Sequence, residues 1–232
     1  MACPGPHIPL TIALAQAVLE RTDAGRVFSA EAAAAAGADL GLSKTHVYKL
    51  LSEMSGEVGL LERPRRGLYV MRPPLGGRDP VRPIAVAVAA VPQAVVAGQS
   101  ALAHWGFLEQ APMHVETLVA PMAPTWTAGV ERRRGVTVWR IPGAAFEYRR
   151  IAPDELFGSS RVRLDAETEV PMFDRERTIV EQFALAPQGA TEMYATHGHA
   201  LDSARLLRYA ARVGGQVEHD IHRAMAQRLV AA

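Results

Sequence analysis

The order of predicted elements over residues 9–71 constrains the fold of this chain more than any other feature, because three short helices are followed by a β-hairpin. The first helix carries apolar side chains at helical spacing from Leu10 to Val18. Ser29 is a suitable N-cap for the second helix, and we expect Gly37 to end that helix in the left-handed conformation.

A third helix is expected to begin after Ser43, whose side chain is suited to cap the first turn. Its buried face is predicted by apolar residues at positions i, i+3, i+4 and i+7, which are Val47, Leu50, Leu51 and Met54. The turn before this helix is brief and contains glycine, as a helix-turn-helix motif requires.

Residues 60–63 and 68–71 are two short strand candidates, and Pro64-Arg65-Arg66-Gly67 is predicted to form the turn between them. Three helices followed by such a hairpin are the signature of a winged helix. We therefore expect a winged helix-turn-helix domain at the beginning of the chain.

The cluster of proline and glycine over residues 73–80 is the expected domain boundary. It separates the winged helix-turn-helix domain, over 1–75, from a second domain over 76–232. The second domain is expected to place strands first and helices last, so the predicted fold class is α+β. Its expected elements are a helix or buried strand over 84–91, a helix over 100–107, strands over 114–120, 136–141 and 145–151, and helices over 174–184, 202–213 and 217–229.

The residue types on the outer face of the third helix suit contact with duplex DNA. In helix-turn-helix proteins this helix lies in the major groove, where lysine donates to guanine or phosphate and threonine offers a methyl group and a hydroxyl. Arginines of the hairpin would follow the phosphate backbone or enter a minor groove. The predicted DNA-binding residues are Ser43, Lys44, Thr45, His46, Tyr48, Lys49, Arg63, Arg65 and Arg66.

Charge placement agrees with this interpretation. The formal net charge of the 232 residues is only +1, whereas residues 41–78 carry seven basic and three acidic side chains. Each phosphate neutralised would steepen the salt dependence of binding by roughly 0.9 in a log–log plot. The alternative is a solvated basic hairpin on a winged helix that binds protein instead of DNA.

Six stretches of the chain, in this order, carry a resemblance to a known family: 42–54, 59–63, 66–70, 96–107, 176–181 and 206–210. They resemble the AbiE antitoxins of type IV toxin–antitoxin systems. The resemblance implies an antitoxin that represses its own operon by binding repeats in its promoter, beside a gene for a nucleotidyltransferase-like toxin. Glu181 stands where the resemblance leads us to expect aspartate.

Candidate catalytic residues do not combine into a site. His197, His199 and the pair His219-Asp220 have metal-binding side chains, but we expect the histidines on polar helical surfaces. Ser100 follows Gly98-Gln99 as in a nucleophile elbow, yet leucine replaces the second glycine, so we expect Ser100 to be a helix N-cap. We predict no enzymatic activity, no metal and no cofactor.

Two further features allow either a purely structural or a functional interpretation. Glu176 and Arg177 are expected to form a surface or interdomain ion pair. The second basic region, which comprises 132–134, Arg140, Arg149 and Arg150, is expected to be a solvated loop and strand edge. Its functional alternatives are a second DNA contact or a surface for an acidic partner.

Two other functions stay open at this stage. One is a winged-helix regulator whose second domain senses a small ligand, and the other is a hydrolase or nucleotidyltransferase-like enzyme with a DNA-binding domain. The single cysteine, Cys3, suits a reducing cytosol. No stretch reaches the ~20 apolar residues of a membrane span, so we expect a soluble, cytoplasmic protein without a membrane partner.

Overall fold

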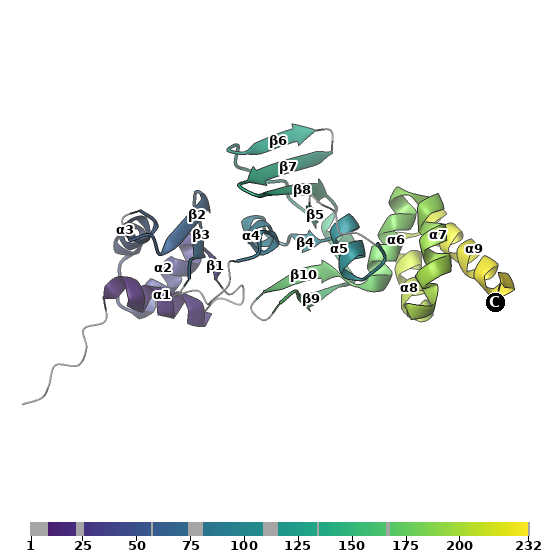
Figure 1. The fold of residues 1–232 in the computed structure, drawn as a ribbon, viewed down its shortest axis with the longest axis horizontal. Coiled ribbons are helices and arrows are strands. Elements are labelled where there is room, and N and C mark those ends of the chain that lie inside the picture. Colours follow the sequence, from purple (N-terminus) through teal and green to yellow (C-terminus); the bar gives the residue numbers. More distant parts are fainter. Residues whose placement is uncertain are drawn as a thin grey trace, which may run out of the picture. The chain divides into compact units, whose positions relative to one another are not determined.

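The computed structural model describes residues 9–21, 26–56, 58–73, 81–108, 116–133, 135–165 and 168–231. The chain divides into two compact units. Unit 1 comprises Met1–Ala90 and Arg163–Glu169, and unit 2 comprises Val91–Val162 and Val170–Ala232. Both contain helices and strands, so the fold class is α+β, as predicted (Figure 1). Most of the expected boundary, residues 74–80, lies outside the described residues.

Unit 1 combines helices with an antiparallel sheet of strand order β1-β3-β2. Val27 of β1 pairs with Val70 of β3, and Leu61 of β2 pairs with Met71 of β3. The helices are α1 (Leu10–Arg21), α2 (Ala30–Asp39), α3 (Lys44–Ser55) and α4 (Pro83–Ala90), and the strands are β1 (Val27–Ser29), β2 (Leu61–Arg65) and β3 (Leu68–Met71). Residues 84–91, for which the sequence allowed either a helix or a buried strand, thus lie largely in a helix.

The core of unit 1 lies between its first three helices and its sheet. Leu14 of α1 and Phe28 of β1 are buried in one cluster with the apolar side of α3. The predicted buried face of α3 is confirmed, since Val47, Leu50, Leu51 and Met54 are all buried. Leu10, expected on the apolar stripe of the first helix, is instead 48% exposed.

The prediction that Gly37 ends α2 is wrong. The helix continues to Asp39, with Gly37 buried inside it. The left-handed residue of this turn is Gly41, which has a φ of 74°. The carbonyl group of Gly37 accepts hydrogen bonds from the N–H groups of Leu40 and Leu42, so the chain turns only after the helix has passed Gly37.

Unit 2 contains a mixed sheet of strand order β6-β7-β8-β5-β4-β10-β9. Strand β5 pairs with β8 in parallel, and β4 with β10 in parallel, whereas β6–β7, β7–β8 and β4–β5 are antiparallel pairs. The strands are β4 (Val95–Val96), β5 (Glu116–Ala120), β6 (Val130–Arg133), β7 (Val136–Ile141), β8 (Ala144–Arg150), β9 (Ser159–Arg163) and β10 (Glu169–Phe173).

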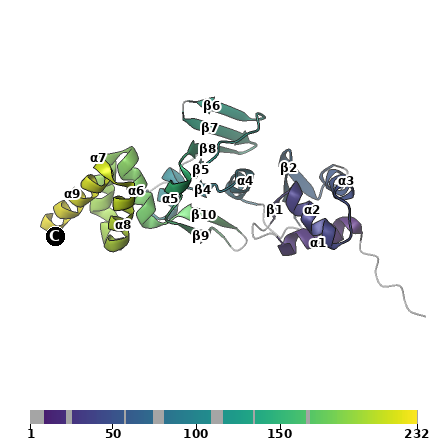
Figure 2. The ribbon, with the colours of Figure 1, turned by 180° about the vertical axis from the view of Figure 1, so that it is seen from behind.

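The helices of unit 2 gather mainly at the end of the chain. They are α5 (Gly98–His104), α6 (Arg175–Leu185), α7 (Pro187–His197), α8 (Ser203–Val213) and α9 (Gly215–Ala231), with short 3-10 helices η1 (Pro153–Glu155) and η2 (Gly198–Ala200). Helices α6 to α9 lie side by side in both views (Figure 1, Figure 2). Ile179, Val180 and Phe183 of α6 face their shared core, as predicted.

Several expectations for unit 2 require correction. Helix α5 begins at Gly98, so Ser100 is not its N-cap. Ser100 is buried inside the helix, and its Oγ accepts a hydrogen bond from the N–H of Thr117 at 2.9 Å. Strands β4, β6, β9 and β10 and helix α7 were not expected. Residues 114–115 of the expected strand over 114–120 lie outside the described residues. No helix within the described residues is long and apolar enough to cross a bilayer.

Candidate nucleic-acid interface

The turn between α2 and α3 determines where α3 begins and how its exposed face is oriented. Gly41 supplies the left-handed conformation that the turn requires, because a residue without Cβ adopts a positive φ at no steric cost. Ser43 then caps α3, with its Oγ accepting from the N–H of His46 at 3.3 Å. The N-cap expected at Ser43 is therefore present.

The side chains predicted to meet DNA from α3 all lie on its outer face. Ser43, Lys44, Thr45, His46, Tyr48 and Lys49 are exposed, as is Ser52. Lys44 Nζ lies 5.6 Å from the centroid of the Tyr48 ring. Lys49 Nζ lies 3.9 Å from Glu53 Oε1, an exposed contact of a kind that contributes little to stability and leaves the lysine accessible.

The hairpin after α3 has a shorter turn than expected. Arg65 pairs with Leu68, so Arg66 and Gly67 alone form the turn. Gly67 has a φ of 79°, a left-handed conformation that glycine adopts without steric cost. The expected four-residue turn is wrong because Pro64 is accommodated within β2, where the pairing register shifts between Glu62 and Arg65.

The three arginines of the hairpin differ in their surroundings. Arg63 and Arg66 are exposed, and the guanidinium carbon of Arg63 lies 5.7 Å from the centroid of the Tyr69 ring. Arg65 is half-buried, and its Nη2 donates to the carbonyl oxygen of Ala90, at the end of α4, at 2.8 Å. The structure therefore gives Arg65 a structural contact, and leaves Arg63 and Arg66 as the cations available on the hairpin.

Helix α3 and the hairpin are neighbours within unit 1. Helix α3 packs against β2, the first strand of the hairpin. Unit 1 thus carries an exposed polar helix face, with its lysines in the first two turns, beside a short hairpin with two exposed arginines. Such a surface can donate hydrogen bonds to base edges from the helix and to phosphates from the hairpin.

Arg149, which the sequence analysis placed in the second basic region, forms a mostly buried ion pair inside unit 2. Its Nη2 donates to Oε1 of Glu181 at 2.6 Å, and the side chains are 19% and 7% exposed. The other carboxylate oxygen of Glu181, Oε2, accepts the N–H of Gly98 at 2.8 Å. Glu181 thereby connects α6 to the start of α5 and to β8.

Glu176 and Arg177 are buried, so the expected surface ion pair is not formed. The Arg177 guanidinium carbon lies 4.6 Å from the ring centroids of both Phe157 and Phe173. Burial lowers the pKa of Arg177 from its ordinary value. Glu176 Oε1 instead accepts the N–H of Asp202 at 2.8 Å, which ties α6 to the start of α8.

Asp174 was not singled out by the sequence, although it caps α6. Its Oδ1 accepts the N–H of Arg177 at 2.8 Å, and its Oδ2 accepts the hydroxyl of Tyr209 at 2.9 Å. Burial raises the pKa of Asp174, against the opposing effect of these two hydrogen bonds. The Tyr209 pKa is raised as well, first by burial and then by its bond to Asp174.

The histidines considered for metal binding have other contacts. The His197 ring packs edge-to-face on Phe107, and His199 Nδ1 lies 3.1 Å from the carbonyl oxygen of Thr196. Asp220 is buried and accepts hydrogen bonds from Gln216 and Arg223. Within the described residues, no three His, Cys, Asp or Glu side chains are grouped so that they could hold a metal ion.

Comparison with known proteins gives a likeness in fold. No protein-family model matches the sequence, and no curated protein matches it. The structure is similar to the crystal structure of the RV2827C protein from Mycobacterium tuberculosis, with a TM-score of 0.54 and 17% sequence identity. The match covers 96% of this chain and 78% of that chain. At this identity the likeness concerns the fold alone.

Proposed function

We propose that unit 1 is a winged helix-turn-helix domain and that the protein is a sequence-specific DNA-binding transcriptional repressor. The observation that carries the proposal is the exposed face of α3, on which Lys44, Thr45 and Lys49 stand in the first two turns after a formed N-cap. These are the positions from which a recognition helix meets base edges in the major groove. Arg63 and Arg66 supply the phosphate contacts beside it.

The proposed biological role is that of the autoregulating antitoxin of a type IV toxin–antitoxin system. Its support is the resemblance of the sequence to the AbiE antitoxins, which includes the α3 segment. The DNA partner is then the protein's own promoter, and the toxin is a nucleotidyltransferase-like protein encoded beside it. Neutralisation of that toxin does not require direct contact with it.

A gel-shift titration with the duplex upstream of the gene tests the proposal. We expect saturable binding that outcompetes an unrelated duplex, and we expect Lys44→Ala and Lys49→Ala each to weaken it by roughly tenfold, as loss of a base or phosphate contact implies. Arg21→Ala is the matched control, because Arg21 is an exposed cation on α1 already paired with Asp39 at 3.2 Å. Equal affinity for both duplexes, or an equal loss in the control, would contradict specific binding through α3.

Co-expression separates an antitoxin from an ordinary repressor. If a nucleotidyltransferase-like protein is encoded beside the gene, its expression alone should arrest growth, and this chain should restore growth. A chain that binds its promoter but leaves the arrest unchanged is a repressor without the antitoxin role.

A further inference from the structure

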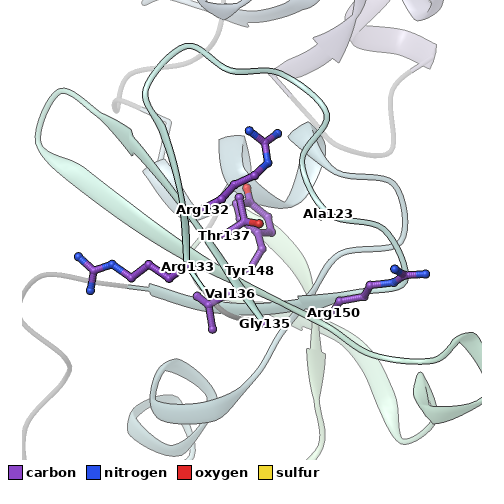
Figure 3. Close-up of a pocket in the computed structure, with 8 residues that line it drawn as sticks. All are labelled: Ala123, Arg132, Arg133, Gly135, Val136, Thr137, Tyr148 and Arg150. Carbon is purple, nitrogen blue, oxygen red and sulfur yellow. The ribbon is translucent and has the colours of Figure 1, made fainter.

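A pocket on one side of the unit 2 sheet has arginines in its wall and no carboxylate (Figure 3). Its volume is about 210 Å³. Arg132 comes from β6, Thr137 from β7, and Tyr148 and Arg150 from β8. These strands are neighbours in the sheet, so regular structure positions the pocket wall.

The strand register explains why these side chains share a face. Arg132 pairs with Thr137, and Thr137 pairs with Tyr148, so the three stand in one row across the sheet. Figure 3 shows Arg132, Thr137 and Tyr148 on the same side of the sheet, with Val136 on the other. Arg150 follows Tyr148 by two residues and therefore belongs to the same face. Thr137 and Tyr148 are buried and form the floor.

The two arginines of this face keep an uncompensated charge. Arg132 Nη2 donates to the carbonyl oxygens of Pro124 at 3.0 Å and of Trp126 at 3.3 Å, which fixes the guanidinium without neutralising it. Neither Arg132 nor Arg150 forms an ion pair within the part of the chain that the structure describes, whereas Arg133, which also lines the pocket, is paired with Glu131 at 2.7 Å. A guanidinium presents a fork of N–H donors that matches carboxylate and phosphate.

A second pocket continues the first and is more apolar. It has a volume of about 720 Å³, shares Gly135 and Arg150 with the first pocket, and includes Met122 and Ile151 in its wall. Glu155 lies at this second pocket, where its Oε2 accepts the N–H of Ala152 at 2.8 Å. Met122 is 55% exposed, so its apolar side chain is accessible to a ligand in this pocket. Gln93 also lines this pocket and has a φ of 58°. Such a conformation costs on the order of 1–3 kcal/mol in a residue other than glycine, and residues of this kind cluster at functional sites.

We propose that unit 2 binds a small organic anion, whose carboxylate or phosphate group lies between Arg132 and Arg150 and whose apolar part lies over Met122 and Ile151. A strand spacing of about 4.8 Å places the Cα atoms of the two arginines on the order of 12 Å apart. In Figure 3 their guanidinium groups point in different directions, so both side chains turn toward the anionic group when it binds. A duplex is too wide to reach the buried floor at Thr137 and Tyr148. This site does not depend on the function of unit 1.

Titration of the full chain with phenyl phosphate, followed by calorimetry and NMR, tests the proposal. We expect saturable binding, tighter than that of inorganic phosphate, which lacks the apolar part. Arg132→Gln and Arg150→Gln should each weaken binding of phenyl phosphate roughly tenfold or more, because each removes a charge-assisted hydrogen bond. Arg150 is exposed, so Arg150→Gln keeps the test decisive if Arg132→Gln disturbs the loop that Arg132 holds.

Arg140→Gln is the matched control, since Arg140 is an exposed arginine of β7 that lines neither pocket. Its affinity for phenyl phosphate should stay unchanged. The absence of saturable binding, or an equal loss in Arg140→Gln, overturns the proposal. A second outcome overturns it as well. If phenyl phosphate does not bind, and Arg132→Gln and Arg150→Gln reduce duplex binding in a Lys44→Ala/Lys49→Ala chain, the surface is a DNA contact.

Discussion

Gly37 of α2 lies directly against Val47 of α3. A Cβ atom at Gly37 would come within 2.3 Å of Val47 Cγ2, far inside van der Waals contact. Val47 is fully buried, and its branched side chain has little freedom to rotate away. This close approach sets the distance between the two helices, and therefore the position of the exposed face of α3.

Replacement of Gly37 by alanine is expected to destabilise unit 1 by about 1 kcal/mol. Alanine gains up to ~1 kcal/mol in helix propensity, but overpacking of a filled core costs roughly 1–3 kcal/mol. Urea unfolding of the wild type and Gly37→Ala measures the difference. In a Val47→Ala chain the same substitution should be neutral or stabilising. If Gly37→Ala has one effect in both chains, the contact with Val47 does not limit this position.

The hairpin arginines should separate into two classes. Arg63→Ala/Arg66→Ala is expected to lower the slope of log affinity against log salt concentration by roughly 1.8, which corresponds to two phosphates. Arg65→Ala should leave that slope nearly unchanged and lower the free energy of unfolding by about 1 kcal/mol, because it removes a hydrogen bond to the end of α4. Gel shifts at several salt concentrations and urea unfolding measure both effects. If the single substitution Arg65→Ala lowers the slope of log affinity against log salt concentration, Arg65 contacts a phosphate and belongs to the interface.

Glu181 should be sensitive even to shortening by one methylene group. Glu181→Asp is expected to cost about 2 kcal/mol, because an aspartate cannot keep both the N–H of Gly98 and the Arg149 guanidinium within reach. Thermal and urea unfolding measure this cost. Glu181→Leu should cost roughly 3 kcal/mol or more, since it leaves Arg149 charged and mostly buried. If Arg149→Leu/Glu181→Leu is as unstable as the sum of its single variants, the two side chains are not coupled.

Local patterns explain how much of unit 1 could be predicted from the sequence. The buried face of α3 follows from apolar spacing alone, and Ser43 is recognisable as a cap because serine oxygens suit the free N–H groups of a first turn. Strand β9, with the sequence Ser-Ser-Arg-Val-Arg, was missed for the opposite reason. It lies at an edge of the sheet and has one buried side chain, so it carries no alternating pattern of apolar residues.

The surroundings of single arginines could not be predicted, because they are set by distant parts of the chain. Arg65 bonds to Ala90, 25 residues away, and Arg149 to Glu181, 32 residues away. The sequence shows a charge at each position but not its partner. The positions of the arginines therefore predicted a basic hairpin and a second basic region. Which arginines in each region are accessible depends on how the chain packs.

Asp174 and Asp202 cap α6 and α8, respectively, yet their pKa values are shifted in opposite directions. Burial raises the pKa of Asp174, whereas the backbone N–H of Arg205 lowers the pKa of exposed Asp202. Between its unfolded and folded pKa values, Asp174 binds more protons in the folded protein, so its contribution to stability falls as pH rises through that window. For Asp202 the unfolded chain binds more protons, and its contribution to stability grows as pH rises.

Asn substitutions should reveal these opposite signs, because asparagine caps a helix about as well as aspartate and does not titrate. The free energy of unfolding is measured for wild type, Asp174→Asn and Asp202→Asn from about pH 3 to about pH 7. The advantage of wild type over Asp174→Asn is expected to shrink over this range, and its advantage over Asp202→Asn to increase. Changes of the same sign would mean that burial does not dominate at Asp174, and that the hydrogen bonds from Arg177 and Tyr209 set its pKa instead.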